Sequence, residues 1–292
     1  QRQMCIRDRV GIDEETGYVV YTPTNGDYGK VIQNSRYAFY NVPEELDAPM
    51  EYYINRDTGM LYIYLPDGWQ ESGVTIGQSL CTRMLESTAS NITFSGLTFR
   101  GTMLDAMKLT GDDITVSGCR ILCIGKNAVD ATGNRILIDG CEVYNVGGNG
   151  IRIGVDKEVR RANIFTDSQV SNCRIHAFEE LDRIYNPGLS LQGLGSRALN
   201  NEIYDAPHLG MSYVGTNIEI AYNIFENLCY DSSDAGALYI YDATITSGGT
   251  KIHDNIVRNI INDENIYFNP HGIYLDAVSY THLRAHETRS NL

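Results

Sequence analysis

Three stretches of sequence decide the fold: NITFSGLTF (Asn91–Phe99), DITVSGCRI (Asp113–Ile121) and RILIDGCEV (Arg135–Val143). Each stretch alternates apolar and polar residues around a central glycine, which is the pattern of a short strand with one buried face. The glycine recurs every 22 residues. A fixed period of this length indicates a repeat architecture in which each unit packs on its neighbours.

Two columns of residues extend the repeat towards the C-terminus. The residue after the glycine gives the first column: Leu97, Cys119, Cys141, Cys173, Asn201, Asn223 and Asn255. The small residue that starts a further strand gives the second: Ala106, Ala128, Gly150, Gly188, Gly210, Ala237 and Gly272. Three strands in 22 residues, with no helical period, predict one coil of a right-handed parallel β-helix whose coils lie about 4.8 Å apart. The predicted fold class is therefore all-β.

The first column predicts how the coils are held together. Its three asparagines suit a ladder in which each side-chain amide bonds to the next coil. Its three cysteines are expected to stack as small buried hydrophobes, because side chains that point the same way are poorly oriented for a disulfide. Cys81, Cys123 and Cys229 have no metal-ligand spacing and are also expected to be buried thiols. We expect neither a metal nor a cofactor.

The two ends differ from the repeat. Residues 1–9 and 278–292 lack it and resemble translated sequencing-adaptor read-through, so we expect them to be non-native. The remainder divides into residues 10–90, with the first coil or coils and an accessory β-hairpin unit, and residues 91–277, with β-helix coils that are truncated at the C-terminus. The hairpin is predicted for YYINRDTGMLYIYLPDG (Tyr52–Gly68), which has two alternating strands around a turn. No signal peptide is visible.

The charge of the chain excludes some partners. The 292 residues include 23 Lys and Arg against 37 Asp and Glu, a net charge of −14. Without the two non-native ends, 18 basic and 35 acidic residues remain, and the net charge is −17. Nucleic-acid binding is excluded because it needs an excess of Lys and Arg. No run of 18 apolar residues exists, so no membrane span is predicted. We expect a monomer.

Departures from the 22-residue period predict the functional face. Every lengthened connection enters or leaves the strand that starts at the second column, so the insertions should form walls around one sheet. Strand alternation sends one row of side chains outward from that sheet: Lys108, Asp130, Arg152, Ser190, Ser212, Tyr239 and Tyr274. Tyr241 and Asp276 follow two residues later on the same face. The sequence therefore predicts a groove with polar and aromatic groups, suited to an extended polar polymer.

The C-terminal coils contain most of the titratable candidates. Asp234 opens DAGALYIY and Asp276 closes HGIYLD on adjacent coils. Two carboxylates across one groove could serve as the acid and the base or nucleophile of glycoside hydrolysis. The candidate substrate contacts are Tyr239, Tyr241, Tyr274, His208, His271, Asp231 and Arg152. His208 is predicted at the groove edge, where it would bond a substrate hydroxyl or tune an aspartate.

The run from about Glu51 to Asp276 resembles the β-helix carbohydrate-active proteins around glycoside hydrolase family 141, with fucosidase and xylanase activities. The matching pieces include LDAPMEYYINRDTGMLYIYLPDG, LNNEIYDAPHLGMSYVGTNIEIAYNIFEN, SSDAGALYIYD and HGIYLDA. The resemblance implies a catalytic pair at Asp234 and Asp276. It also implies a polysaccharide or oligosaccharide substrate and a secreted, periplasmic or cell-surface bacterial protein. The family usually has glycine where Met50 stands.

Two other classes of function remain open. Polysaccharide lyases and uronate epimerases also use β-helices, but they need cations near a uronate. On the outward row only Lys108 and Arg152 are basic, and a net charge of −17 repels polyuronates. A non-catalytic glycan-binding adhesin is the other alternative, and it would not require that the two carboxylates pair.

Overall fold

In a computed structural model of the chain, the described residues are 9–12, 15–16, 19–21, 41–70, 76–155, 164–232, 234–241, 248–260 and 270–276. They fall into two compact units, one within Arg7–Gln78 and one from Ser79 onward. Most of the two non-native ends predicted from the sequence lies outside the described residues. Among the described residues, no helix is long and apolar enough to cross a membrane.

The described residues of the N-terminal unit form two small antiparallel pairs and one short helix. β1 (Arg9–Ile12) pairs with β2 (Val19–Tyr21), η2 (Pro43–Glu45) is a 3₁₀ turn, and β3 (Tyr52–Asn55) pairs with β4 (Met60–Ile63). The β3–β4 pair confirms the hairpin predicted around the Asp57–Gly59 turn. Met50 has φ of +75°, the left-handed region that favours glycine, which explains why glycine suits this position.

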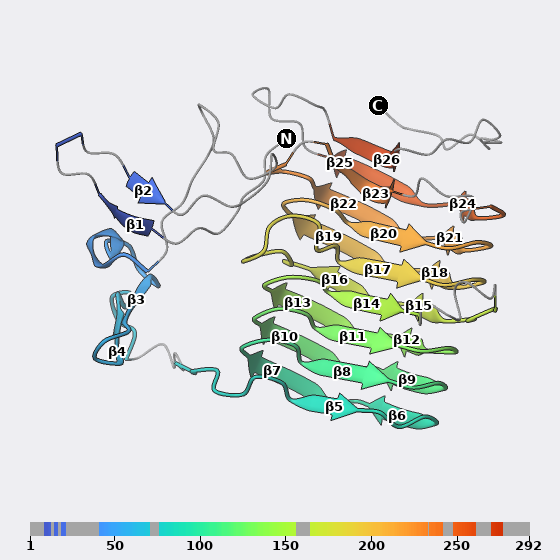
Figure 1. Ribbon diagram of the computed structural model, residues 1–292, viewed down its shortest axis with the longest axis horizontal. Coiled ribbons are helices and arrows are strands. Elements are labelled where there is room, and N and C mark those ends of the chain that lie inside the picture. The colour runs from blue at the N-terminus through green and yellow to red at the C-terminus, as the bar shows by residue number, and fades with distance from the viewer. Residues whose placement is uncertain are drawn as a thin grey trace. The chain divides into compact units, whose positions relative to one another are not determined.

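From β5 onward the described chain forms a parallel β-helix with three sheets, which appear as three stacks of arrows in Figure 1. This architecture confirms the predicted fold. The strands of the eight-stranded sheet, in order, are β5 (Leu85–Ser87), β8 (Met107–Thr110), β11 (Val129–Thr132), β14 (Ile151–Gly154), β17 (Leu189–Gln192), β20 (Met211–Val214), β23 (Gly236–Tyr241) and β26 (His271–Asp276).

Two seven-stranded sheets complete each coil of the described part. The first contains β6 (Ile92–Ser95), β9 (Ile114–Ser117), β12 (Leu137–Asp139), β15 (Gln169–Ser171), β18 (Arg197–Leu199), β21 (Glu219–Ala221) and β24 (Lys251–His253). The second contains β7 (Thr98–Thr102), β10 (Arg120–Ile124), β13 (Glu142–Val146), β16 (Arg174–His176), β19 (Glu202–Ala206), β22 (Ile224–Leu228) and β25 (Ile256–Ile260).

The register of the eight-stranded sheet is the one predicted from the sequence. One row of paired residues runs from Leu85 through Met107 to Ile273, and its members from Met107 to Leu238 are at most 1% exposed. The next residue of each strand forms the outward row from Lys108 to Tyr274. Since successive side chains alternate between faces, burial of the first row turns the second row away from the core.

The asparagine ladder is also confirmed. The side-chain amide of Asn201 donates to Asn223 Oδ1, and that of Asn223 donates to Asn255 Oδ1, each at 2.9 Å. Asn201 and Asn223 are completely buried. The ladder therefore supplies partners for polar groups that have no access to water.

The stacked cysteines Cys119, Cys141 and Cys173 are free and buried, as expected. The prediction of buried thiols is right for Cys229 but wrong for Cys81 and Cys123, which are both exposed. Cys123 is in the left-handed conformation, with φ of +56°, and it breaks the alternation within β10 so that its side chain faces solvent.

Candidate active site

The two predicted catalytic aspartates lie on adjacent coils of the eight-stranded sheet. Asp234 precedes β23 and has φ of +58°, whereas Asp276 is the last residue of β26. β23 and β26 pair in parallel, with Tyr239 opposite Tyr274. Tyr274 and Asp276 are two residues apart on one strand, so both lie on the outward face that Tyr239 also occupies.

Two tyrosine–aspartate hydrogen bonds cross between these coils. Tyr239 Oη donates to Asp276 Oδ2 at 2.9 Å, and Tyr274 Oη donates to Asp234 Oδ1 at 3.0 Å. The two tyrosine rings meet edge to face, with their centroids 5.5 Å apart. Each carboxylate is therefore oriented by a hydroxyl group from the other coil.

The environment raises the pKa of both tyrosine hydroxyls. Burial is the largest cause in each case, followed by the hydrogen bond to Asp276 for Tyr239 and to Asp234 for Tyr274. The pKa of Tyr274 rises to about 12, and the nearby charges of Asp234 and Asp276 contribute to this. Tyr274 thus remains a donor to Asp234 at neutral pH. Tyr239 and Tyr274 lie opposite each other on paired strands and each bonds one aspartate, so the two tyrosines and the two aspartates form one cluster.

The sequence of this chain matches the family described as "Right handed beta helix region" over residues 105–285, which is more than half of its length. The chain belongs to the right-handed beta-helix family. Neither the comparison with curated proteins nor the comparison with solved structures finds a match.

His271 and Tyr241 of this beta-helix protein border the cluster. The ring of His271 lies 4.6 Å from that of Tyr274, centroid to centroid, and the imidazole is exposed. Tyr241 is the backbone partner of Asp276 in the pairing of β23 with β26. The side chain of Tyr241 lies outside the described residues.

His208 and Asp231 occupy supporting positions. His208 is only 2% exposed and its Nδ1 accepts the backbone N–H of Tyr185 at 3.3 Å, so its imidazole is covered by protein. Asp231 Oδ2 accepts two hydrogen bonds from the guanidinium of Arg183, at 3.1 and 3.2 Å. Tyr239 is itself only 6% exposed, so its ring face is covered, and its contribution to the cluster is the hydroxyl group that bonds Asp276.

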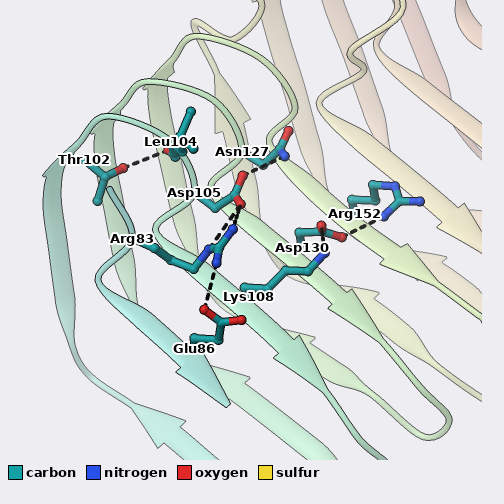
Figure 2. Close-up of polar contacts among 9 residues, drawn as sticks. All are labelled: Arg83, Glu86, Thr102, Leu104, Asp105, Lys108, Asn127, Asp130 and Arg152. Carbon is teal, nitrogen blue, oxygen red and sulfur yellow. Dashed lines mark hydrogen bonds and ion pairs between the residues drawn. The ribbon is translucent and has the colours of Figure 1, made fainter. Parts of the chain in front are cut away.

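Arg152 lies apart from the aspartates. Its strand, β14, is separated from β23 by β17 and β20, a distance of about 14 Å at ordinary strand spacing. Its Nη1 donates to Asp130 Oδ1 at 2.7 Å, and Lys108 bonds to the other oxygen of the same carboxylate (Figure 2). The three cations of Figure 2 balance its three carboxylates: Arg83, Lys108 and Arg152 against Glu86, Asp105 and Asp130.

This charge ladder has a structural role. Burial, the largest single cause, raises the pKa of Asp130, but the hydrogen bonds and positive charges of Lys108 and Arg152 together outweigh burial and lower it. Oppositely charged residues directly across paired strands stabilise a sheet. Among the described residues, no three His, Cys, Asp or Glu side chains gather so that they could hold a metal ion.

The stability of the fold is expected to depend on the protonation of His208. Burial lowers its pKa from about 6.5 in an unfolded chain to about 4, because the charged imidazolium is poorly solvated. Between pH 6.5 and 4 the unfolded chain therefore binds a proton that the folded chain does not, and the unfolding free energy falls as the pH falls. A shift of this size corresponds to about 3 kcal/mol.

Chemical denaturation of the wild type and of His208→Gln at several pH values would measure this contribution as the difference between their slopes. The variant is needed because buried Glu179, 4.0 Å from His208, has a pKa raised by burial and contributes the opposite slope. Equal slopes for the two proteins between pH 4 and 6.5 would contradict the prediction.

The structure adds residues that sequence reasoning missed. Glu179, Arg183 and Tyr185 lie in the connection between β16 and β17 and approach the cluster through His208, Asp231 and Tyr239. The insertion in this connection was the only available signal, because residues inside an insertion follow no repeat that would fix their direction.

Proposed function

We propose that this β-helix protein is a glycoside hydrolase that acts on plant or host polysaccharide side chains, with Asp234 and Asp276 as its catalytic pair. The observation that carries the proposal is the pair of crossed hydrogen bonds from Tyr239 and Tyr274 to the two aspartates. Hydrolysis of a glycosidic bond needs one carboxyl group that protonates the leaving oxygen and a second that acts as base or nucleophile.

The position of the two aspartates on adjacent coils suits this chemistry. Carboxyl groups lie about 5–5.5 Å apart in retaining glycosidases and about 6.5–9.5 Å apart in inverting ones. The two aspartates bond a pair of tyrosines whose ring centroids are 5.5 Å apart, which supports the assignment of both carboxyl groups to one site. Each aspartate offers one oxygen to a tyrosine and the second to the substrate.

The resemblance to glycoside hydrolase family 141 supports the same two residues, because it assigns the pair to the DAGALY and GIYLD elements. The charge of the chain supports a neutral glycan over a polyuronate. Lys108 and Arg152, the basic residues of the outward row, belong to the ladder of three cations and three carboxylates, which leaves no surplus positive charge for uronates. A polymeric glycan substrate implies an extracellular, periplasmic or cell-surface site of action.

Incubation of the chain with fucosides, xylans and pectic side chains tests the proposal. The expected products are new reducing ends or free monosaccharides. Unsaturated products from a polyuronate would instead establish a lyase. Saturable glycan binding with no product from any substrate would establish a binding protein, and either result would overturn the proposal.

A further inference from the structure

The connection between β16 and β17 is a rigid insertion. From Cys173 to Gly188 it takes 15 residues, where the plain coils take 9, as from Cys119 to Ala128. Its first part is bonded to the preceding coil: the backbone N–H groups of residues 179–182 donate to the carbonyl oxygens of residues 146–148 at 2.8–3.1 Å. The start of the insertion is therefore part of the solenoid.

The tip of the insertion is held by two buried acceptors. The backbone N–H of Asn186 donates to Glu179 Oε1 at 2.8 Å, and that of Tyr185 donates to His208 Nδ1 at 3.3 Å. Glu179 is completely buried, and its Oε2 is buried without a hydrogen-bond partner. Burial raises the pKa of Glu179 and lowers that of His208, so it favours the neutral form of both side chains over an ion pair.

A buried acid with an incompletely satisfied carboxyl group destabilises the fold, because desolvation of a polar group without a hydrogen bond is unfavourable. Glu179 is thus costly for stability, while its Oε1 fixes one backbone position of the insertion. Groups that lower stability and fix local geometry are concentrated at functional sites. Glu179 lowers stability but fixes the backbone of the tip, and this combination indicates that the conformation of the tip matters to function.

Tyr185 is the residue that the two acceptors orient. Its φ of +56° is uncommon for a bulky side chain, and neighbouring contacts must maintain it. The residue is 52% exposed, and its ring meets that of His208 edge to face, with the centroids 4.8 Å apart, and lies 6.3 Å from the ring of Tyr239. Tyr239 in turn bonds Asp276. An exposed aromatic side chain is thus fixed beside the aspartate cluster.

A salt bridge ties the insertion to the segment that carries Asp234. Arg183 and Asp231 are 23% and 20% exposed, and their guanidinium and carboxylate groups meet at 3.1 Å. Asp231 lies three residues before Asp234. The ring contact of Tyr185 with Tyr239 and the ion pair of Arg183 with Asp231 therefore both join the insertion to the coil that contains Asp234 and β23.

We propose that Tyr185 is a substrate-binding residue, an aromatic platform for a neutral pyranose ring next to the aspartate pair, and that Glu179 and His208 are its positioning residues. The role of the platform rests on the proposed function, since it takes the substrate of that reaction to be a glycan. A rigid aromatic ring binds the apolar face of a sugar at low entropic cost, because few torsions remain to be ordered.

The test measures binding directly, so that it does not depend on turnover. Isothermal titration with xylohexaose, cellohexaose and a fucosylated xyloglucan oligosaccharide is made with Asp276→Asn, which removes one proposed catalytic carboxylate. In that background, Tyr185→Ala is expected to weaken binding about five- to tenfold, and Tyr185→Phe to leave it nearly unchanged.

Tyr222→Ala is the matched control. Tyr222 also has a left-handed φ, of +61°, is 56% exposed, and meets a histidine, His253, edge to face, but it lies between β21 and β22 at the corner of the asparagine ladder. This variant should bind as the parent does.

Glu179→Gln and Glu179→Leu test the positioning role. Gln keeps an oxygen acceptor for the N–H of Asn186 and should preserve affinity, whereas Leu removes the acceptor and should weaken binding as much as Tyr185→Ala does. Thermal melting of both variants separates a loss of affinity from unfolding. If Glu179→Leu does not fold, the affinity of Tyr185→Ala alone tests whether Tyr185 binds the sugar.

Equal affinity of Tyr185→Ala and its parent, or no binding of any of the three neutral oligosaccharides, would overturn the inference. The two proposals fail separately. Aspartate-dependent hydrolysis without an effect of Tyr185 on affinity rejects the platform alone, whereas Tyr185-dependent binding without hydrolysis rejects the glycosidase alone.

Discussion

Asp276→Asn and Asp234→Asn are each expected to lower kcat by a factor of about 10³ or more on the glycan that the chain hydrolyses. Asparagine has nearly the same shape as aspartate but can neither ionise nor donate an acidic proton. Its side-chain oxygen still accepts the hydroxyl of Tyr239 or Tyr274. The chemical step should therefore be lost while the crossed hydrogen bonds, and with them the fold, are retained.

Steady-state kinetics of both variants would check this expectation, together with thermal melting to establish that each is folded. Asp205→Asn is a matched control, because Asp205 also has a left-handed φ, of +56°, and pairs with one side-chain donor, Asn227, but lies at the exposed surface of β19. Its turnover should equal that of the wild type. Unchanged turnover in either Asp234→Asn or Asp276→Asn would remove that residue from the catalytic pair.

The repeat explains how much of the fold could be predicted from the sequence. Stacked coils impose one register on every strand, so the spacing between Met107, Val129 and Ile151 is enough to assign their common row. Burial of that row then determines the direction of its neighbours, including Tyr239 and Tyr274. The two aspartates could be assigned to one face for the same reason, since both lie within or beside strands that follow the repeat.

The contacts around the aspartates could not be predicted in the same way. His208 was expected at an accessible edge, but the insertion that contains Tyr185 covers it. The sequence gives the length of an insertion but not the path of its backbone, which here depends on a buried acceptor, Glu179, that no repeat position specifies. Only the structure reveals that two of the lengthened connections meet, through Arg183 and Asp231.

A second polar ladder was missed although its signal was present. Polar residues precede the second column in three consecutive coils, at Asp105, Asn127 and Asn149. They bond from coil to coil, from Asn127 to Asp105 at 2.8 Å and from Asn149 to Asn127 at 3.0 Å (Figure 2 shows the first of these). The 22-residue spacing alone would have predicted this ladder by the argument that predicted the other one.

Asn223→Ala is expected to lower the free energy of unfolding by about 4 kcal/mol. The side-chain nitrogen of Asn223 donates to Asn255 Oδ1 and to the carbonyl oxygens of Ala198 and Ala221, at 2.9–3.0 Å. Its oxygen accepts both the backbone N–H and the side-chain amide of Asn201, each at 2.9 Å. Alanine leaves several buried groups without partners, and each such group costs about 1–3 kcal/mol.

Denaturant unfolding of the variant, with Ser95→Ala as control, measures this loss. Ser95 accepts one hydrogen bond between coils, from Ser117, at an exposed position, so its removal should cost less than about 0.5 kcal/mol. Asn223→Asp separates hydrogen bonding from volume, because it fills the same space but presents an oxygen to the carbonyl groups of Ala198 and Ala221. It should destabilise the protein at least as much as alanine does. A cost for Asn223→Ala as small as that of the serine control would mean that backbone pairing and apolar burial, rather than the amide ladder, hold this corner of the coils together.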